Sequence, residues 1–149
     1  MDKNSYSDMG PIVALATARG ESALALVRVS GEGSLGLLAS CFSRPRALLA
    51  ARGHSLVYGW IDGGADGGGR VDEVLVLVFR EPHGFTGEEG ADICCHGGVA
   101  APDAVVRLLV SRGFRPALPG EFSFRAFLNG KIDLSRAEAV MELVCSPND

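Results

Sequence analysis

The order of two hydrophobic patterns along the chain constrains its fold more than any other feature. Short apolar runs of strand length come first, at residues 12–17, 23–29, 54–62 and 71–80. Apolar residues at helical spacing dominate the last third instead. Strands followed by helices, without a regular alternation of the two, are typical of α+β folds. We therefore expect an α+β fold in which a mixed β-sheet packs with helices and the C-terminal third is rich in helix.

Three segments carry the helical pattern. Residues 33–42 have a short apolar stripe, and residues 101–113 have a longer one that ends at a glycine. A further short helix is expected over residues 121–128, because it is followed by an Asn-Gly pair suited to the left-handed conformation. Ser135 and Glu138 have the spacing of a capping box, which predicts the start of a last helix.

The chain length fits one domain. A chain of 149 residues can remove roughly 70% of its unfolded surface from water, so it needs no disulfide or metal to fold. We interpret residues 1–149 as a single domain with a polar, flexible lead at residues 1–10. Residues 81–90 contain Pro82 and several glycines, which favour a loop over any regular element.

The composition excludes several classes of function. Fourteen basic and eighteen acidic residues give a net charge of −4, so no overall positive field draws nucleic acid to this segment alone. No run approaches the roughly 18 apolar residues of a membrane span, and the polar start lacks the apolar core of a signal peptide. The four cysteines have no regular spacing. We therefore expect reduced thiols, a cytoplasmic location and no membrane partner.

The stretch ADICCHGG, residues 91–98, raises three alternatives: a metal site, a catalytic thiol or the end of a strand. Strand alternation places Asp92, Cys94 and His96 on one face, but a tetrahedral zinc site needs three or four converging donors. A histidine can also lower the pKa of a nearby thiol. Half-buried small residues in a strand are the more common arrangement, so we assign neither a metal ligand nor a catalytic residue.

The motif GEGSLG, residues 31–36, matches the dinucleotide-binding pattern G-x-G-x-x-G between a strand and a helix. The strand before it is expected to pair with its neighbour instead of opening a strand–helix–strand unit, and Asp62 comes late for the acidic partner. We favour a plain turn over a phosphate site. No P-loop pattern occurs in the chain, so it cannot bind GTP by that route.

Two opposite charges lie within apolar strands. Arg28 shares a strand face with two leucines, and Asp92 lies on the face described above. A charge in such a place is costly unless it is paired or contacts a ligand. The spacing leaves an ion pair between the two, an exposed sheet face and a binding site as alternatives. Lys131 and Arg125 are expected to be ordinary solvated charges.

Three ordered blocks of the sequence resemble one protein family. They are IVALATARGESALALVRVSG near the start, DEVLVLVFREPHGFTGEEGADICCHGG in the middle, and PGEFSFRAFLNGKIDLSRAEAVMELV at residues 119–144. Together they are similar to the N-terminal domain of the tRNA-modification GTPases called TrmE or MnmE. The resemblance extends over nearly the whole chain.

The resemblance implies a homodimeric α+β module, similar to the folate-binding domain of aminomethyltransferases, that binds 5-formyl-tetrahydrofolate near the dimer interface. Residues 133–149 would begin the connection to a helical domain and a GTPase domain, which uses GTP, Mg²⁺ and K⁺ outside this chain. With the flavoprotein MnmG, such proteins install an aminomethyl-type group at C5 of wobble uridine in tRNA. The chain is thus expected to be a fragment that completes no reaction alone.

The resemblance also implies site residues. The folate-contacting arginine of the family falls on Arg28, its lysine on Lys131 and its acidic contact on Asp92, where a glutamate is usual. One acid and two bases suit a folate, because its pterin has a donor edge while its carbonyl, formyl oxygen and glutamate tail attract cations.

Other functions remain open at this point. Asp92 is shorter than glutamate by one methylene, which leaves a purely structural dimerisation module without folate binding as the alternative. A stand-alone enzyme that transfers an aminomethyl or formyl group is a further alternative, but no general base with a clear partner is evident in the sequence. A zinc or thiol protein ranks last.

Overall fold

A computed structural model describes residues 10–145 of the chain. The strands are β1 (Ile12–Leu15), β2 (Leu24–Ser30), β3 (Ser55–Asp62), β4 (Arg70–Phe79), β5 (Gly90–His96) and β6 (Arg115–Pro116). The helices are α2 (Ser34–Ala39), α3 (Pro45–Ala50), α4 (Ala100–Ser111), α5 (Glu121–Leu128) and α6 (Leu134–Cys145). The lead predicted for residues 1–10 lies, apart from Gly10, outside the described residues.

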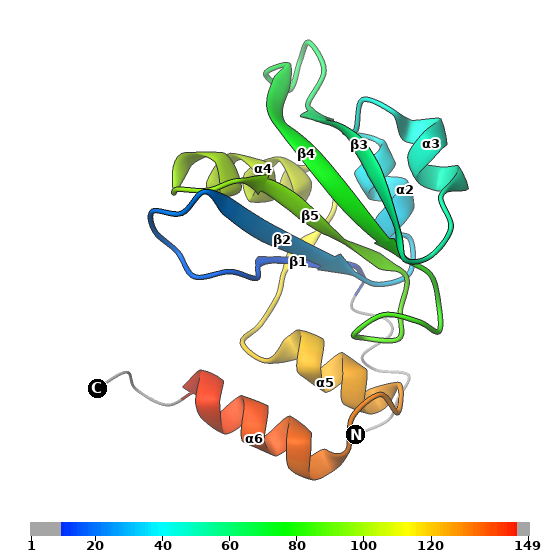
Figure 1. Cartoon of the computed structure of the whole chain (residues 1–149), viewed down its shortest axis with the longest axis vertical. Coiled ribbons are helices and arrows are strands. Elements are labelled where there is room, and N and C mark those ends of the chain that lie inside the picture. Colours follow the sequence, from blue (N-terminus) through cyan, green and yellow to red (C-terminus); the bar gives the residue numbers. More distant parts are fainter. Residues whose placement is uncertain (1–9, 146–149) are drawn as a thin grey trace.

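The strands form one six-stranded sheet in the order β3-β4-β5-β2-β1-β6 (Figure 1). All neighbouring strands are antiparallel except β1 and β6, which are parallel. The sheet is therefore mixed, and the predicted α+β fold with helices packed on a mixed sheet is confirmed. None of the helices within residues 10–145 is long and apolar enough to cross a membrane.

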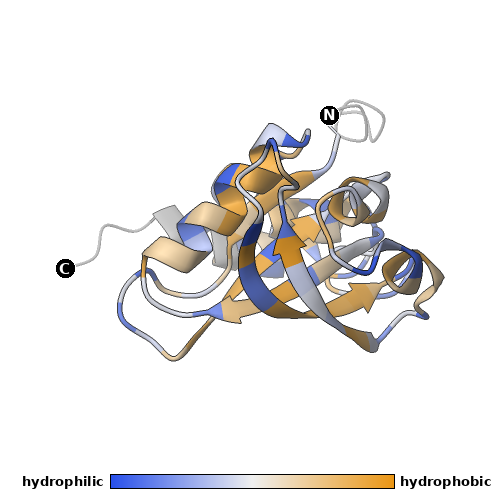
Figure 2. Ribbon diagram, turned by 90° about the horizontal axis from the view of Figure 1, so that it is seen from above, coloured by the Kyte–Doolittle hydropathy of each residue, from blue (hydrophilic) through white to orange (hydrophobic). Residues whose placement is uncertain are grey.

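One face of the sheet carries the hydrophobic core, and α2, α3 and α4 cover this face (Figure 1). Val27, Val76 and Ile93 from three central strands are fully buried there with Leu38 of α2 and Leu109 of α4. Hydrophobic and hydrophilic residues both occur along the strands, and the hydrophobic ones are more frequent (Figure 2). Because successive side chains of a strand point to opposite faces, the residues of β2 and β5 that alternate with the core residues lie on the other face of the sheet.

The helices α5 and α6 form a pair on the other side of the molecule from α4 (Figure 1). The bounds of α5 agree with the prediction, whereas α6 begins earlier than the capping box indicated. Asp133 Oδ1 accepts the backbone N–H of Arg136 at 2.7 Å, which is the bond an N-cap residue makes. The capping box predicted for Ser135 and Glu138 is therefore wrong, because Ser135 already lies inside the helix.

Two short elements, α3 and β6, have no counterpart among the sequence predictions. The helix α3 begins with Pro45 in its first turn and buries one residue, Leu48, so it lacks the repeated apolar positions that indicated α2. The strand β6 has two residues and pairs with β1 through Ile12 and Arg115. Both elements depend on tertiary contacts more than on local pattern.

The GEGSLG segment is a turn fixed to the loop before β5. The Gly31 N–H and the Ser34 hydroxyl both donate to the Glu89 carbonyl, at 3.0 and 3.1 Å. A Cβ atom on Gly31 would lie 2.8 Å from Pro11 Cα, so this glycine permits a close backbone approach. Because β2 pairs antiparallel with β1, the motif also lacks the strand–helix–strand unit of a dinucleotide site.

Candidate functional site

Arg28 and Asp92 lie side by side on the sheet face opposite the core. Val27 and Val29 of β2 are buried in the core, so Arg28 between them points to the other face. Ile93 of β5 is likewise in the core, and Asp92 next to it points away. The strand register then places Arg28 directly opposite Asp92.

The two side chains form a bidentate ion pair. Arg28 Nε donates to Asp92 Oδ1 at 2.9 Å, and Arg28 Nη2 donates to Asp92 Oδ2 at 3.2 Å. This is the ion-pair alternative that the sequence left open. The carboxylate of Asp92 is almost buried, and its pairing offsets part of the cost of removing it from water. Both oxygens of Asp92 are thus engaged by Arg28.

Arg28 also faces a pocket of about 390 Å³, a size that suits a small molecule. The Phe85 and Phe122 rings flank the guanidinium, with their centroids 5.1 and 6.0 Å from Arg28 Cζ. The pocket lies between β1, β2 and the start of α5, and its described lining comprises Ala14, Leu15, Ala16, Arg28, Phe85, Ala117, Leu118, Pro119, Gly120, Phe122 and Ser123. Asp92 instead lines a crevice of about 10 Å³, which has room for at most one water.

Lys131 does not join the ion pair. Its side chain is exposed, as predicted, and its Nζ donates to the Pro82 carbonyl at 3.4 Å. It lines a second pocket of about 350 Å³ together with Gly84, Phe85, Ile132 and Arg136. Phe85 lines both pockets and also the crevice of Asp92, so the three residues that the resemblance implied are divided among three neighbouring spaces that share Phe85.

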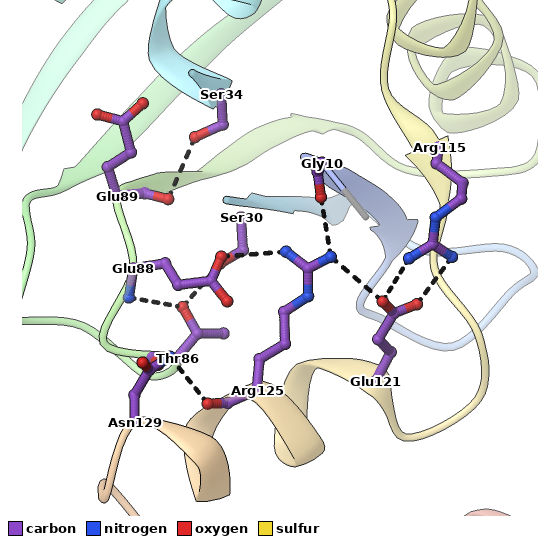
Figure 3. A network of polar contacts seen from close by, with 10 residues as sticks. All are labelled: Gly10, Ser30, Ser34, Thr86, Glu88, Glu89, Arg115, Glu121, Arg125 and Asn129. Atoms are coloured by element: carbon purple, nitrogen blue, oxygen red, sulfur yellow. Dashed lines mark hydrogen bonds and ion pairs between the residues drawn. The ribbon is translucent and has the colours of Figure 1, made fainter. Parts of the chain in front are cut away.

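Arg125 is the centre of a buried ionic network that the sequence pattern did not indicate (Figure 3). Its side chain is 4% exposed, so the expectation of a solvated charge is wrong. It donates to Glu88 Oε2 at 3.0 Å, to the Gly10 carbonyl at 2.8 Å and to Glu121 Oε2 at 3.3 Å. Arg115 pairs with the same Glu121 carboxylate. The i,i+4 spacing of Glu121 and Arg125 is a sequence signal that could have indicated one pair of this network.

The network links α5 to the loop that contains Phe85, and it shifts the pKa values of two carboxyl groups. Burial raises the pKa of Glu88 above its usual value, and the charge and hydrogen bond of Arg125 only partly oppose this. Burial would also raise the pKa of Glu121, but hydrogen bonds from Arg115 and the Leu118 N–H, with the charges of Arg115 and Arg125, outweigh it and lower the pKa. Glu121 is therefore held as a carboxylate.

The side chains of the CCH segment diverge. Cys95 is buried in the core, where burial, with the charge of Asp72 adding to it, raises its pKa to about 11. Cys94 lies on the opposite face. His96 Nδ1 is 2.7 Å from Asp72 Oδ1, and the His96 backbone N–H donates to Asp72 Oδ2 at 2.8 Å. Within the described part of the chain, no three His, Cys, Asp or Glu side chains are grouped to hold a metal ion.

Fold and site together define a class of protein: an α+β domain whose mixed sheet presents a paired arginine to a pocket of ligand size. The family model described as "GTP-binding protein TrmE N-terminus" matches residues 11–131. The match covers most of the chain, and the chain belongs to this family.

Relatives with the name tRNA modification GTPase MnmE agree with this assignment. The protein of Treponema pallidum (strain Nichols) is 51% identical over 144 residues, which are 97% of this chain and 28% of the relative. That of Treponema denticola is 48% identical over 149 residues, 100% of this chain and 31% of the relative. That of Symbiobacterium thermophilum is 44% identical over 140 residues, with 93% and 30% covered. The chain spans about three tenths of the length of these relatives.

Proposed function

We propose that this chain is the folate-binding and homodimerising N-terminal part of a tRNA modification GTPase, with 5-formyl-tetrahydrofolate as its ligand. Its relatives carry the name tRNA modification GTPase over a longer chain. On this proposal GTP, Mg²⁺ and K⁺ act outside this segment, and the flavoprotein MnmG joins in modifying wobble uridine of tRNA in the cytoplasm. The fold is proposed to be related to the folate-binding domain of aminomethyltransferases.

The observation that carries the folate proposal is the pocket in front of Arg28. Most of its lining is apolar, and the Phe85 and Phe122 rings offer flat faces on which a pterin can stack. A guanidinium has five N–H donors, so Arg28 keeps donors for a ligand carbonyl beyond its two bonds to Asp92. Asp92 then acts as a positioning residue, because it fixes the plane of the guanidinium.

The proposed role is binding and presentation of the one-carbon donor. The described residues lining the pocket include no carboxylate or histidine that could serve as a general base. Arg28 cannot take a proton from a substrate, since its guanidinium stays protonated. Turnover therefore requires groups from the longer protein or its partner.

Titration of the 149-residue chain with 5-formyl-tetrahydrofolate tests the proposal. At a ligand concentration of 100 times Kd, the free energy of unfolding should rise by about 2.7 kcal/mol. The Arg28→Met variant should lose most of this stabilisation, whereas Arg107→Met, which removes an exposed arginine from α4, should keep it. A wild-type unfolding midpoint that folate does not shift would reject folate binding.

The role of Asp92 is tested by a double-mutant cycle. If Asp92 acts through Arg28, Asp92→Asn should weaken folate binding in the wild-type background and have no further effect in Arg28→Met. Additive losses in the double variant would show instead that Asp92 contacts the ligand directly.

A structural dimerisation module without folate binding is the second candidate, and the bidentate pairing of Asp92 with Arg28 favours it.

Dimerisation itself is supported by the sheet face opposite the core. Leu56, Tyr58 and Leu75 are exposed there on β3 and β4, with Leu56 64% exposed. A contiguous apolar face of this kind is typical of a protein–protein interface.

A further inference from the structure

The pocket beside Lys131 has an electrostatic character different from the pocket of Arg28. Its volume is about 350 Å³, and two of its five described lining residues, Lys131 and Arg136, are basic while none is acidic. It lies where the loop before β5 meets the turn between α5 and α6. A concave site lined by cations without a carboxylate favours an anionic ligand.

Both cations are attached to well-defined backbone. The Lys131 N–H donates to the Ala126 carbonyl at 2.8 Å, which ends α5, and a Cβ on Gly87 would lie 3.3 Å from Lys131 Cγ. The loop therefore packs closely on the lysine stem. Arg136 lies in the first turn of α6, where its N–H is bonded to the Asp133 side chain. Two cations held on separate elements can contact two separate negative groups of one ligand.

Phe85 connects this pocket to the pocket of Arg28. Its ring is 5.1 Å from Arg28 Cζ, and the same residue lines the space that contains Lys131 and Arg136. Phe85 is 43% exposed, so it separates the two pockets only in part. A ligand that stacks in front of Arg28 can extend past Phe85 and place its far end between the two cations.

We infer that the pocket of Lys131 and Arg136 is a subsite for the poly-γ-glutamyl tail of a long-chain folate. The inference rests on the proposed folate binding. Each γ-linked glutamate adds one carboxylate to the tail, so the tail supplies a series of anions that suits two spaced cations. The subsite makes the chain selective for polyglutamylated over monoglutamylated folate.

The test compares the mono- and triglutamate forms of 5-formyl-tetrahydrofolate by isothermal titration calorimetry. Two exposed cation–carboxylate contacts should make the triglutamate bind roughly three- to tenfold more tightly to the wild-type chain. The advantage should shrink at about 1 M salt, where the Debye length is about 3 Å. Arg136→Gln should abolish most of it and leave monoglutamate affinity unchanged, whereas Arg107→Gln on α4 should change neither.

Equal affinities of the two forms for the wild-type chain would overturn the tail subsite and leave the folate proposal standing. An advantage that persists unchanged in both Arg136→Gln and Lys131→Gln would also overturn it, since the tail would then bind elsewhere. If neither form binds, the folate proposal fails and the subsite with it.

Discussion

Arg125 joins three parts of the chain that are far apart in sequence. Its guanidinium contacts Glu88 in the loop before β5, Glu121 one turn earlier on α5, and the Gly10 carbonyl ahead of β1 (Figure 3). Two carboxylates near one buried guanidinium are stable only while the positive charge is present. The position of α5 relative to the sheet, and hence the pocket of Arg28, depends on this side chain.

Replacing Arg125 by methionine is expected to destabilise the fold by about 3–5 kcal/mol, because Glu88 and Glu121 would remain buried without their common partner. The free energy of unfolding from urea titration measures this loss. Arg107→Met removes an exposed arginine and should stay within about 0.5 kcal/mol of wild type. Equal stability of the two variants would contradict a structural role for the network.

The lowered pKa of Glu121 predicts a contribution to acid sensitivity. Its folded pKa lies below the ordinary value of 4.5, so its stabilising effect is complete above that pH and is lost as the pH falls through the folded pKa. Wild type should therefore lose stability below about pH 4.5 more steeply than Glu121→Gln. Urea unfolding at a series of acidic pH values measures the slopes, and Glu138→Gln, an exposed site on α6, should keep the wild-type slope.

At the level of single residues, the sequence predicted which residues of one strand share a face, because strand alternation decides this. The opposite faces of Cys94 and Cys95 followed from the two-residue period, whereas the pairing of Arg28 with Asp92 was one of several alternatives until the register of β2 and β5 was known. The burial of Arg125 could not be predicted in the same way. Its partner Glu88 is 37 positions away and the Gly10 carbonyl 115 positions away, and no local pattern reports such contacts.

A single side chain determines the residue at which α6 begins. Asp133 and Ser135 are both good N-cap residues by type, and only the structure distinguishes them. Long periodic segments such as α4 and the strands β3 and β4 were predicted nearly to their ends, whereas α3 and β6 were not. The helix α3 buries a single residue, Leu48, and β6 has two residues, so neither displays a period and packing decides them.

Asp133→Ala is expected to cost about 1 kcal/mol through loss of the cap on the Arg136 N–H. Ser135→Ala should change stability by less than about 0.5 kcal/mol, because Ser135 is an exposed residue inside the helix. Thermal unfolding followed by circular dichroism measures both. A larger loss of stability for Ser135→Ala than for Asp133→Ala would support a capping box at Ser135.

At the scale of the whole molecule, the sheet is covered unequally. Three helices close the core face (Figure 1), while Leu56, Tyr58 and Leu75 on the opposite face remain exposed. If the proposed homodimer uses this face, Leu75→Arg would bury a charge at its centre and raise the dimer dissociation constant by about thirtyfold or more.

Sedimentation velocity over a range of concentrations measures the shift from dimer to monomer. Val110→Arg is the matched control, since it adds the same charge to an exposed valine on α4, behind the core face. An unchanged dimer in Leu75→Arg would place the interface on another surface.

The pairing of β2 with β5 has a consequence for the synthesis of the protein. Arg28 and Asp92 are 64 positions apart, and at about 5–20 residues per second the ribosome adds that length in roughly 3–13 s. During that interval one edge of β2 has no partner and could pair with another nascent chain. The unpaired Arg28 charge on an otherwise apolar strand opposes such pairing. A charge on an unpaired strand edge is a feature that disfavours edge-to-edge pairing, and Asp92 pairs with this charge once β5 has joined β2.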